Sequence, residues 1–139
     1  MIELENNTSL NIDEDFLNEI ASYVTKKYIE LIITNETEIR KINKQYRNID
    51  KSTDVLSFPY EDMPMAPLGS IVISDKHVID KSNEFGHSKD DELALLFIHG
   101  LLHLVGYDHE VDDGEMRLKE EEIINKFKLP QSLIIRTQG

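Results

Sequence analysis

Three of the chain's five histidines fall within eleven residues, in the segment HGLLHLVGYDH at positions 99–109. Residues four apart lie on the same face of a helix, so His99 and His103 can present two imidazole nitrogens to one ion. Gly106 can adopt the left-handed conformation that reverses a chain after a helix, which would bring His109 to the same ion. The segment therefore predicts a metal site with three histidine ligands.

Three neutral imidazoles with a vacant fourth position are typical of a catalytic zinc, whereas structural zinc sites are closed by four protein ligands and are often rich in cysteine. The alternative is that His99 and His103 are hydrogen-bonded core residues, because the helix around them is apolar on nearly every side. Burying two imidazoles with no acid within four residues is costly unless something coordinates them. We therefore favour the zinc site.

The spacing also matches the metalloprotease pattern H-E-x-x-H-x-x-G-x-x-H, except that Gly100 stands where that pattern has its general-base glutamate. Without this carboxylate the proton shuttle of a peptidase is missing. Hydrolysis at this site must use another base or the metal-activated water itself. Asp108 is either an acceptor for an imidazole N–H or a turn residue, and both interpretations stay open.

A second feature is a basic segment in an otherwise acidic chain. It contains Arg40, Lys41, Lys44, Arg47 and Lys51. We interpret the segment as a whole as a solvated helix face, because acids intervene. Arg47 differs, because it leads directly into the segment 48–59, where its planar donor fork could clamp a phosphate beside the metal.

The remaining histidines and one acid carry weaker signals. His77 lies within a predicted helix, and His87 follows a glycine that ends one. Glu92 precedes His99 by seven residues, but an acid in the first turn of a helix is explained by the helix dipole. We assign none of the three to the site.

These residues need elements to position them, and hydrophobic periodicity predicts where the elements lie. We expect strands at 2–5, 30–34, 55–58 and 71–73, and a proline-containing loop over 59–69. Helices are expected from Asp13 to about 28, at 36–47, from Ser74 or Asp75 to Phe85, at about 90–105 and at about 112–127. In the helix at 36–47, we expect Ile39, Ile42 and Tyr46 to face inward. Asp112 and Glu115 are spaced as a capping box for the last helix.

This order of elements predicts an α+β (mixed α/β) domain with a small sheet of about four strands and about five helices. The metal site would lie on a core helix and the turn that follows it. With 139 residues the chain is expected to form one domain over residues 1–139.

Composition narrows the class of protein further. The formal net charge is −12, whereas a free-standing nucleic-acid binder is normally basic, so any RNA contact must be local. The chain has no cysteine, which excludes disulfides and thiolate sites and fits a reducing compartment. The N-terminus lacks a secretory pattern and no apolar run approaches ~20 residues, so we expect a cytoplasmic protein without a membrane partner.

Three segments together resemble one family, the YbeY endoribonucleases, which are also described as rRNA maturation factors. They are YR at 46–47 followed by TDVLSFP at 53–59, LGSIVI at 68–73, and the histidine segment at 99–109. The third is the most specific, because it combines the missing glutamate with the third-ligand spacing. One departure is Ser70, where the family usually has an acid.

The resemblance implies a zinc-dependent endoribonuclease that cuts single-stranded RNA in 16S rRNA 3′-end maturation and in ribosome quality control. His99, His103 and His109 match the family's zinc ligands, and Arg47 matches its active-site arginine. Implied partners are rRNA and the small ribosomal subunit with its proteins. Two alternatives are a non-catalytic assembly factor with a structural zinc, and a metallohydrolase of another bond, against which Gly100 argues.

Overall fold

The computed structural model describes residues 1–61, 63–107 and 114–130. Its four strands are β1 (Ile2–Asn6), β2 (Ile29–Thr34), β3 (Val55–Pro59) and β4 (Gly69–Ser74). Its five helices are α1 (Glu14–Val24), α2 (Glu36–Arg47), α3 (Asp75–Phe85), α4 (Lys89–Leu104) and α5 (Glu115–Lys126). The predicted α+β class, four-stranded sheet and five helices are confirmed.

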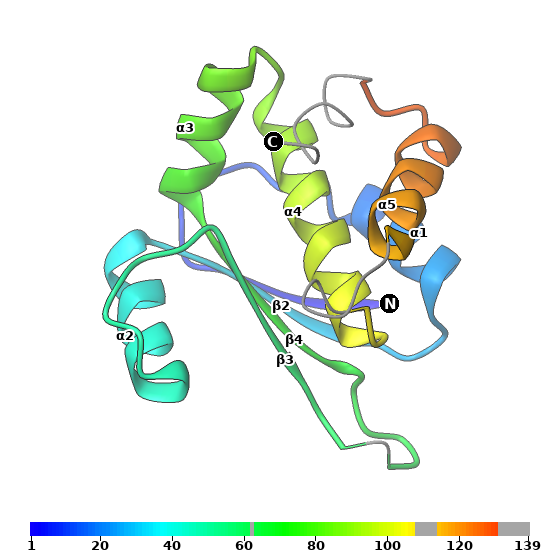
Figure 1. Ribbon diagram of the computed structural model, residues 1–139, viewed down its shortest axis with the longest axis horizontal. Helices are drawn as coiled ribbons and strands as arrows, with labels where there is room; N and C mark the ends of the chain where they lie inside the picture. The colour runs from blue at the N-terminus through cyan, green and yellow to red at the C-terminus, as the bar shows by residue number, and fades with distance from the viewer. Residues whose placement is uncertain (62, 108–113, 131–139) are drawn as a thin grey trace.

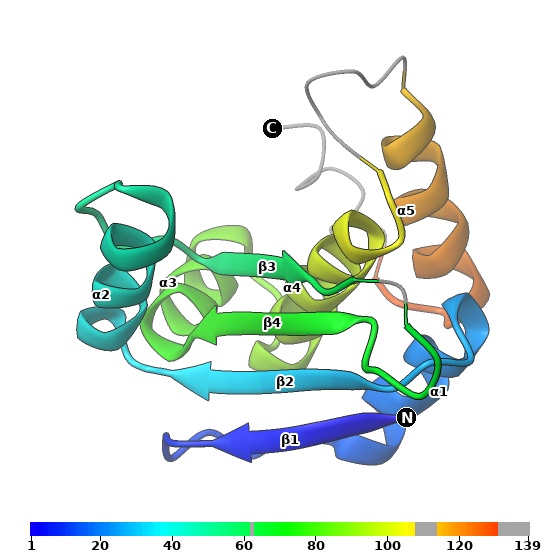
Figure 2. The same ribbon diagram turned by 90° about the horizontal axis from the view of Figure 1, so that it is seen from below.

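The strands form one mixed sheet in the order β1-β2-β4-β3. β1 with β2 and β2 with β4 are parallel pairs, whereas β3 runs antiparallel to β4, with Ser57 opposite Ile71. β3 is thus an edge strand. Figure 2 shows the four strands side by side, with β3 next to α4.

Helices cover the two faces of the sheet unequally. Figure 1 shows α2 alone on one face, and α1, α3, α4 and α5 on the other. The larger core lies on the four-helix face and includes Phe97, Ile98 and Ile71, all fully buried. The face under α2 has only a small cluster of Ile39, Leu56 and Val72. The alternating strand residues divide between the two cores, as the period of two requires.

Several helix starts follow the expected capping chemistry. The side chains of Asp13, Asn35 and Ser88 each accept a hydrogen bond from the backbone N–H three residues later. Gly86 ends α3 with φ 71°, as predicted.

Three local predictions were wrong. α1 ends at Val24 rather than near residue 28, and the next residues lead into β2. Tyr46 does not face the core but is 66% exposed, while Asn43 is buried instead. α5 begins at Glu115 with Gly114 as its N-cap. Glu115 is therefore the first residue of the helix, whereas a capping box requires the glutamate at the third residue. Asp112 lies outside the described residues.

No helix in the described parts of the chain has both the length and the apolar character needed to cross a membrane.

Candidate metal centre and active-site cavity

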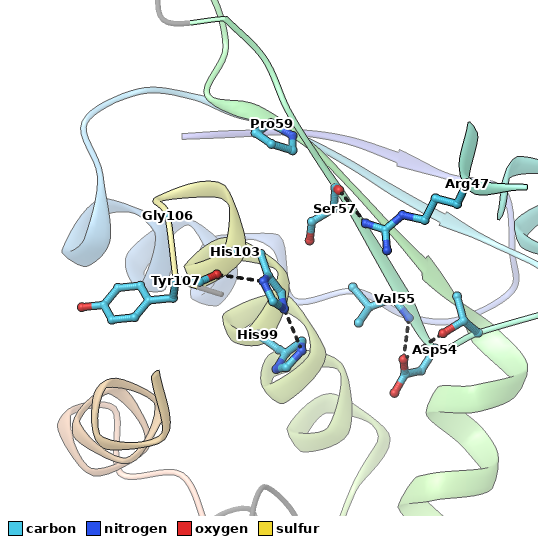
Figure 3. Close-up of a pocket in the computed structure, with 10 residues that line it drawn as sticks. Arg47, Asp54, Val55, Ser57, Pro59, His99, His103, Gly106 and Tyr107 are labelled. Atoms are coloured by element: carbon cyan, nitrogen blue, oxygen red, sulfur yellow. Dashed lines mark hydrogen bonds between the residues drawn. The ribbon is translucent and has the colours of Figure 1, made fainter. Parts of the chain in front are cut away.

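Helix α4 brings His99 and His103 together at one end of the larger core. The helix is almost entirely buried, and its apolar side chains fix its position on the sheet. The two imidazole rings have centroids 4.7 Å apart at an interplanar angle of 80°, and their Nε2 atoms are 3.2 Å apart. Figure 3 shows both rings pointing into the same cavity. The spacing of four residues thus produces the predicted convergence.

Each of these imidazoles is oriented by an acceptor at its other nitrogen. His103 Nδ1 lies 2.9 Å from the carbonyl oxygen of Tyr107, and His99 Nδ1 lies 2.9 Å from Oε1 of Glu120 on α5. A carbonyl oxygen only accepts, so Nδ1 of His103 carries the proton, and a carboxylate favours the same tautomer for His99. In the neutral rings, both Nε2 atoms then present lone pairs to the same point.

This arrangement fits a zinc ion. Zinc–imidazole bonds are about 2.0–2.1 Å long, so two nitrogens 3.2 Å apart can both contact one ion at an angle near the tetrahedral value. Two facing lone pairs repel each other unless a cation or a proton lies between them. Metal-binding histidines usually donate their other ring N–H to a carboxylate or a backbone carbonyl. Glu120 and the Tyr107 carbonyl are acceptors of this kind for His99 and His103.

The turn after α4 has the predicted form. Gly106 has φ 109°, and its backbone N–H donates to the carbonyl of His103, so the chain reverses immediately after the helix. His109 and Asp108 lie outside the described residues. Within the residues that are described, no group of three or more potential metal ligands gathers, which leaves His99 and His103 as the observed pair.

Arg47 reaches the same cavity from the opposite side. It is the last residue of α2, where Asn48 adopts a left-handed conformation with φ 58°. The following loop is tied back by Asn43, whose Nδ2 donates to the carbonyl of Lys51 at 3.0 Å. Arg47 Nη2 donates to the Ser57 carbonyl at 3.2 Å, at the open edge of β3.

Ser57 connects the two halves of the site. Its carbonyl accepts from Arg47, while its buried hydroxyl donates to the carbonyl of Gly100 at 3.1 Å. One strand residue therefore fixes both the arginine and the histidine helix; Figure 3 shows its bond to Arg47.

The side chains enclose a cavity of about 590 Å³. It is lined by Arg47, Thr53, Asp54, Val55, Ser57, Pro59, His99, His103, Gly106 and Tyr107. The cavity is large enough for a phosphodiester and part of a nucleotide, since ligand pockets begin at roughly 300 Å³.

Gly100 faces the sheet, and the structure explains why no larger residue stands there. A Cβ atom at this position would lie 2.9 Å from Cγ2 of Ile71 and 3.0 Å from Oγ of Ser57. A glutamate of the peptidase kind has no room here. Close packing of Gly100 against Ile71 and Ser57 therefore explains why the peptidase glutamate is absent at this position.

Two acids of the site were missed by the sequence reasoning. Glu120 is 3% exposed and holds His99, although it lies 21 residues further along the chain. It lies on the buried stripe of α5 with Met116, Ile123 and Ile124. An acid on an otherwise apolar stripe indicates a buried polar partner, so the sequence pattern could have identified it. Asp54 lines the cavity, and its carboxylate accepts from the backbone N–H of Val55 at 2.8 Å.

The other singled-out residues lie elsewhere. His77 Nδ1 is 2.9 Å from Oγ of Ser74, and His87 is paired with Glu92 at 2.8 Å in the core. In the basic segment, the hydrogen bond between Arg40 and Asp50 raises the pKa of the arginine and lowers that of the aspartate. Lys41 pairs with Glu38. These pairs support the interpretation of a solvated face.

Known proteins resemble this chain over nearly its whole length. The sequence model of the family described as Endoribonuclease YbeY matches residues 2–128. A Sulfurimonas denitrificans protein named Endoribonuclease YbeY is 63% identical over 139 residues, which is 100% of both chains. A Helicobacter pylori protein of the same name is 50% identical over 99% of each chain. The solution structure of a Thermotoga maritima protein matches with a TM-score of 0.63 and 29% identity, covering 91% of this chain and 89% of that one.

Proposed function

Because this chain belongs to the YbeY endoribonuclease family, we propose that it cuts single-stranded RNA in rRNA maturation, with one zinc ion held by His99, His103 and His109. The proposed place of cleavage is the 3′ end of 16S rRNA, and the proposed wider role is ribosome quality control. The proposal of a zinc enzyme rests on one observation above all. The Nε2 atoms of His99 and His103 converge within 3.2 Å in a cavity that Arg47 also lines.

The residues of the site have separate roles in this proposal. A zinc ion bound by the histidines would activate water for attack on phosphorus and offset negative charge. Glu120 and the Tyr107 carbonyl hold the two imidazoles in the tautomer that binds a metal. Arg47 binds the phosphate and stabilises the charge that develops on its oxygens in the transition state.

The geometry of Arg47 suits that role. Its bond to the Ser57 carbonyl occupies one of the five N–H donors of a guanidinium, and the planar fork can direct others to phosphate oxygens. Ser57 acts as a positioning residue, because it binds both Arg47 and the backbone of α4.

RNA is the substrate, and the proposed partners are the small ribosomal subunit and its proteins. The net charge of −12 opposes general attraction to RNA. Delivery of the substrate by a ribosomal surface would overcome that repulsion, and binding to free RNA should be weak.

The test is cleavage of an end-labelled single-stranded RNA by wild type, His103→Ala and Arg47→Ala, purified identically, with bound zinc quantified in each. Lys44→Ala is the matched control, because Lys44 is an exposed basic residue one turn before Arg47 on the same helix. Parallel purification also detects a contaminating nuclease, which would cleave in every preparation.

We expect wild type and Lys44→Ala to carry about one zinc per chain and to cleave. His103→Ala should lose both zinc and cleavage. Arg47→Ala should keep zinc and lose cleavage by about 100-fold or more, as for removal of a charge-stabilising donor. Equal cleavage by all four preparations, or zinc-loaded wild type that does not cleave, would contradict the proposal.

A further inference from the structure

The face of the sheet under α2 is only partly covered. α2 packs on the small cluster of Ile39, Leu56 and Val72, and the remaining surface forms a groove of about 480 Å³. We call it the α2-face groove. Its principal lining residues are Ile32, Ile42, Tyr46, Phe58, Tyr60 and Ser70. α2, which borders the groove, lies on the opposite face of the sheet from α4, which carries His99 and His103 (Figure 1).

Exposed aromatic rings border the groove. Tyr46 is 66% exposed and Tyr60 is 43% exposed. The ring of Tyr46 lies 5.5 Å from that of Phe58, tilted by 59°. Tyr46 occupies an inward position in the hydrophobic period of α2, yet the helix leaves its ring in solvent beside an apolar surface. Such rings are typical stacking platforms for the bases of single-stranded nucleic acids.

The groove and the histidine cavity share a border at β3. Pro59 lines both spaces. Arg47 lines the histidine cavity and donates to the β3 edge at Ser57, while its guanidinium lies 5.8 Å from the ring centroid of Phe58 in the groove. Arg47 therefore lies beside both spaces, so an RNA strand whose phosphate binds Arg47 has a neighbouring nucleotide close to the groove.

Charge favours a base rather than a phosphate in the groove. Most of its lining is apolar, and the Tyr60 hydroxyl at its rim donates to the carboxylate of Glu30 at 2.8 Å. An acid beside the rim repels phosphate but not a neutral base. In a chain of net charge −12, stacking also provides affinity that general electrostatic attraction does not.

We propose that the α2-face groove is a nucleobase subsite, in which a base flanking the scissile phosphate stacks on Tyr46. This inference rests on the proposed function and adds a substrate-binding residue to it. The other occupant that an apolar groove could take is a segment of a partner protein, which the experiment below distinguishes.

The first experiment compares kcat and KM for a labelled single-stranded oligoribonucleotide with wild type, Tyr46→Ala, Tyr46→Phe and Tyr23→Ala. Tyr23 is a matched control, since it is 42% exposed on α1, on the other face of the sheet. Tyr46→Ala should raise KM by about 5- to 100-fold, the range for loss of one stacked base, with kcat within about twofold of wild type. Tyr46→Phe keeps the ring and should retain the wild-type KM, as should Tyr23→Ala.

The second experiment reads stacking without cleavage. In a His103→Ala background, an oligoribonucleotide carrying 2-aminopurine is titrated with protein, and its fluorescence should be quenched on binding in a manner that depends on Tyr46. This readout separates the two proposals, because it does not need an active enzyme.

Unchanged KM and unchanged quenching in Tyr46→Ala would overturn the inference and leave a protein segment as the occupant to test. Tyr46-dependent quenching combined with absent cleavage by zinc-loaded wild type would instead overturn the proposed function and leave the subsite standing.

Discussion

At the scale of single residues, the site depends on side chains that fix the two histidines. Glu120 is buried at 3% exposure, and its carboxylate binds the Nδ1 of His99 at 2.9 Å. A carboxylate at this position fixes the ring and increases the basicity of the other nitrogen. Its role would be to tune metal affinity rather than to touch substrate.

Glu120→Gln should weaken zinc binding by about 10- to 100-fold, because the amide keeps the shape but not the charge of the acceptor. A competitive titration against a chelator of known affinity measures the change. Glu115→Gln removes an exposed carboxylate from the start of the same helix and should leave the affinity unchanged. Equal zinc affinity in Glu120→Gln and wild type would show that the bond to His99 has no role in metal binding.

Local spacing predicted the histidine pair, because i and i+4 on a helix share a face whatever the tertiary structure. Arg47 was singled out for its position before the segment 48–59, but its hydrogen bond to Ser57 depends on how α2 meets the edge of β3. Glu120 was missed because it reaches His99 from 21 residues away, and only packing of α5 on α4 creates that contact.

At the scale of elements, the position of the histidines depends on how closely α4 approaches the sheet. Gly100 is the point of contact, with Ile71 and Ser57 in the positions that a Cβ atom would need. The hydrogen bond from the Ser57 hydroxyl to the Gly100 carbonyl lies at the same point. A displacement of α4 here would move His99 and His103 relative to Arg47.

Gly100→Ala should therefore lower the free energy of unfolding by about 1–3 kcal/mol through overpacking. Helix propensity alone predicts the opposite sign, since alanine is favoured over glycine by about 1 kcal/mol in a helix interior. Denaturant unfolding measures the difference. The control is Asn83→Ala, at an exposed position of α3, which should be neutral or slightly stabilising. A Gly100→Ala protein as stable as wild type would contradict the close contact.

Periodicity located the strands and helices well, and α2 begins and ends where predicted. The errors came from tertiary context. Tyr46 fits the apolar stripe of α2, but its ring lies at the groove beside Phe58 and stays exposed. Asn43 is buried instead and holds the loop at Lys51. The parallel and antiparallel pairing of the strands was not predicted, because it depends on which strands become neighbours.

At the scale of the whole molecule, we expect the fold not to depend on the metal site. The larger core is continuous from β1 to α5 and is built from apolar side chains such as Ile20, Phe97 and Ile124. His99 and His103 lie at its margin. This arrangement differs from small zinc-folded domains, which have too little core to fold without metal.

Chelation should accordingly remove zinc and activity but leave the fold intact. We expect an unchanged far-UV circular dichroism spectrum and a Tm lowered by several degrees, because a ligand at 100 times its Kd stabilises by about 2.7 kcal/mol. Adding zinc back should restore the Tm. Unfolding of the chelated protein would instead favour the assembly factor with a structural zinc.

The negative charge of the molecule gives a further prediction. Binding to free single-stranded RNA should be weak at physiological salt and should involve few phosphates, near Arg47. A plot of log K against log salt concentration should therefore have a slope of about −1 to −2, since each phosphate contributes about −0.7. Fluorescence anisotropy between about 50 and 200 mM salt measures the slope. A slope of about −5 or steeper would indicate an extensive basic surface.

The central claim is that zinc bound by the histidines is required for RNA cleavage. The most direct measurement is titration of the metal-free protein with zinc while cleavage of a labelled single-stranded RNA is followed, in wild type and in Arg47→Ala. Wild-type activity should rise with added zinc and reach its maximum at about one equivalent, whereas Arg47→Ala should bind the same equivalent and stay inactive. Metal-free wild type that cleaves as fast as the zinc-loaded protein would contradict the claim.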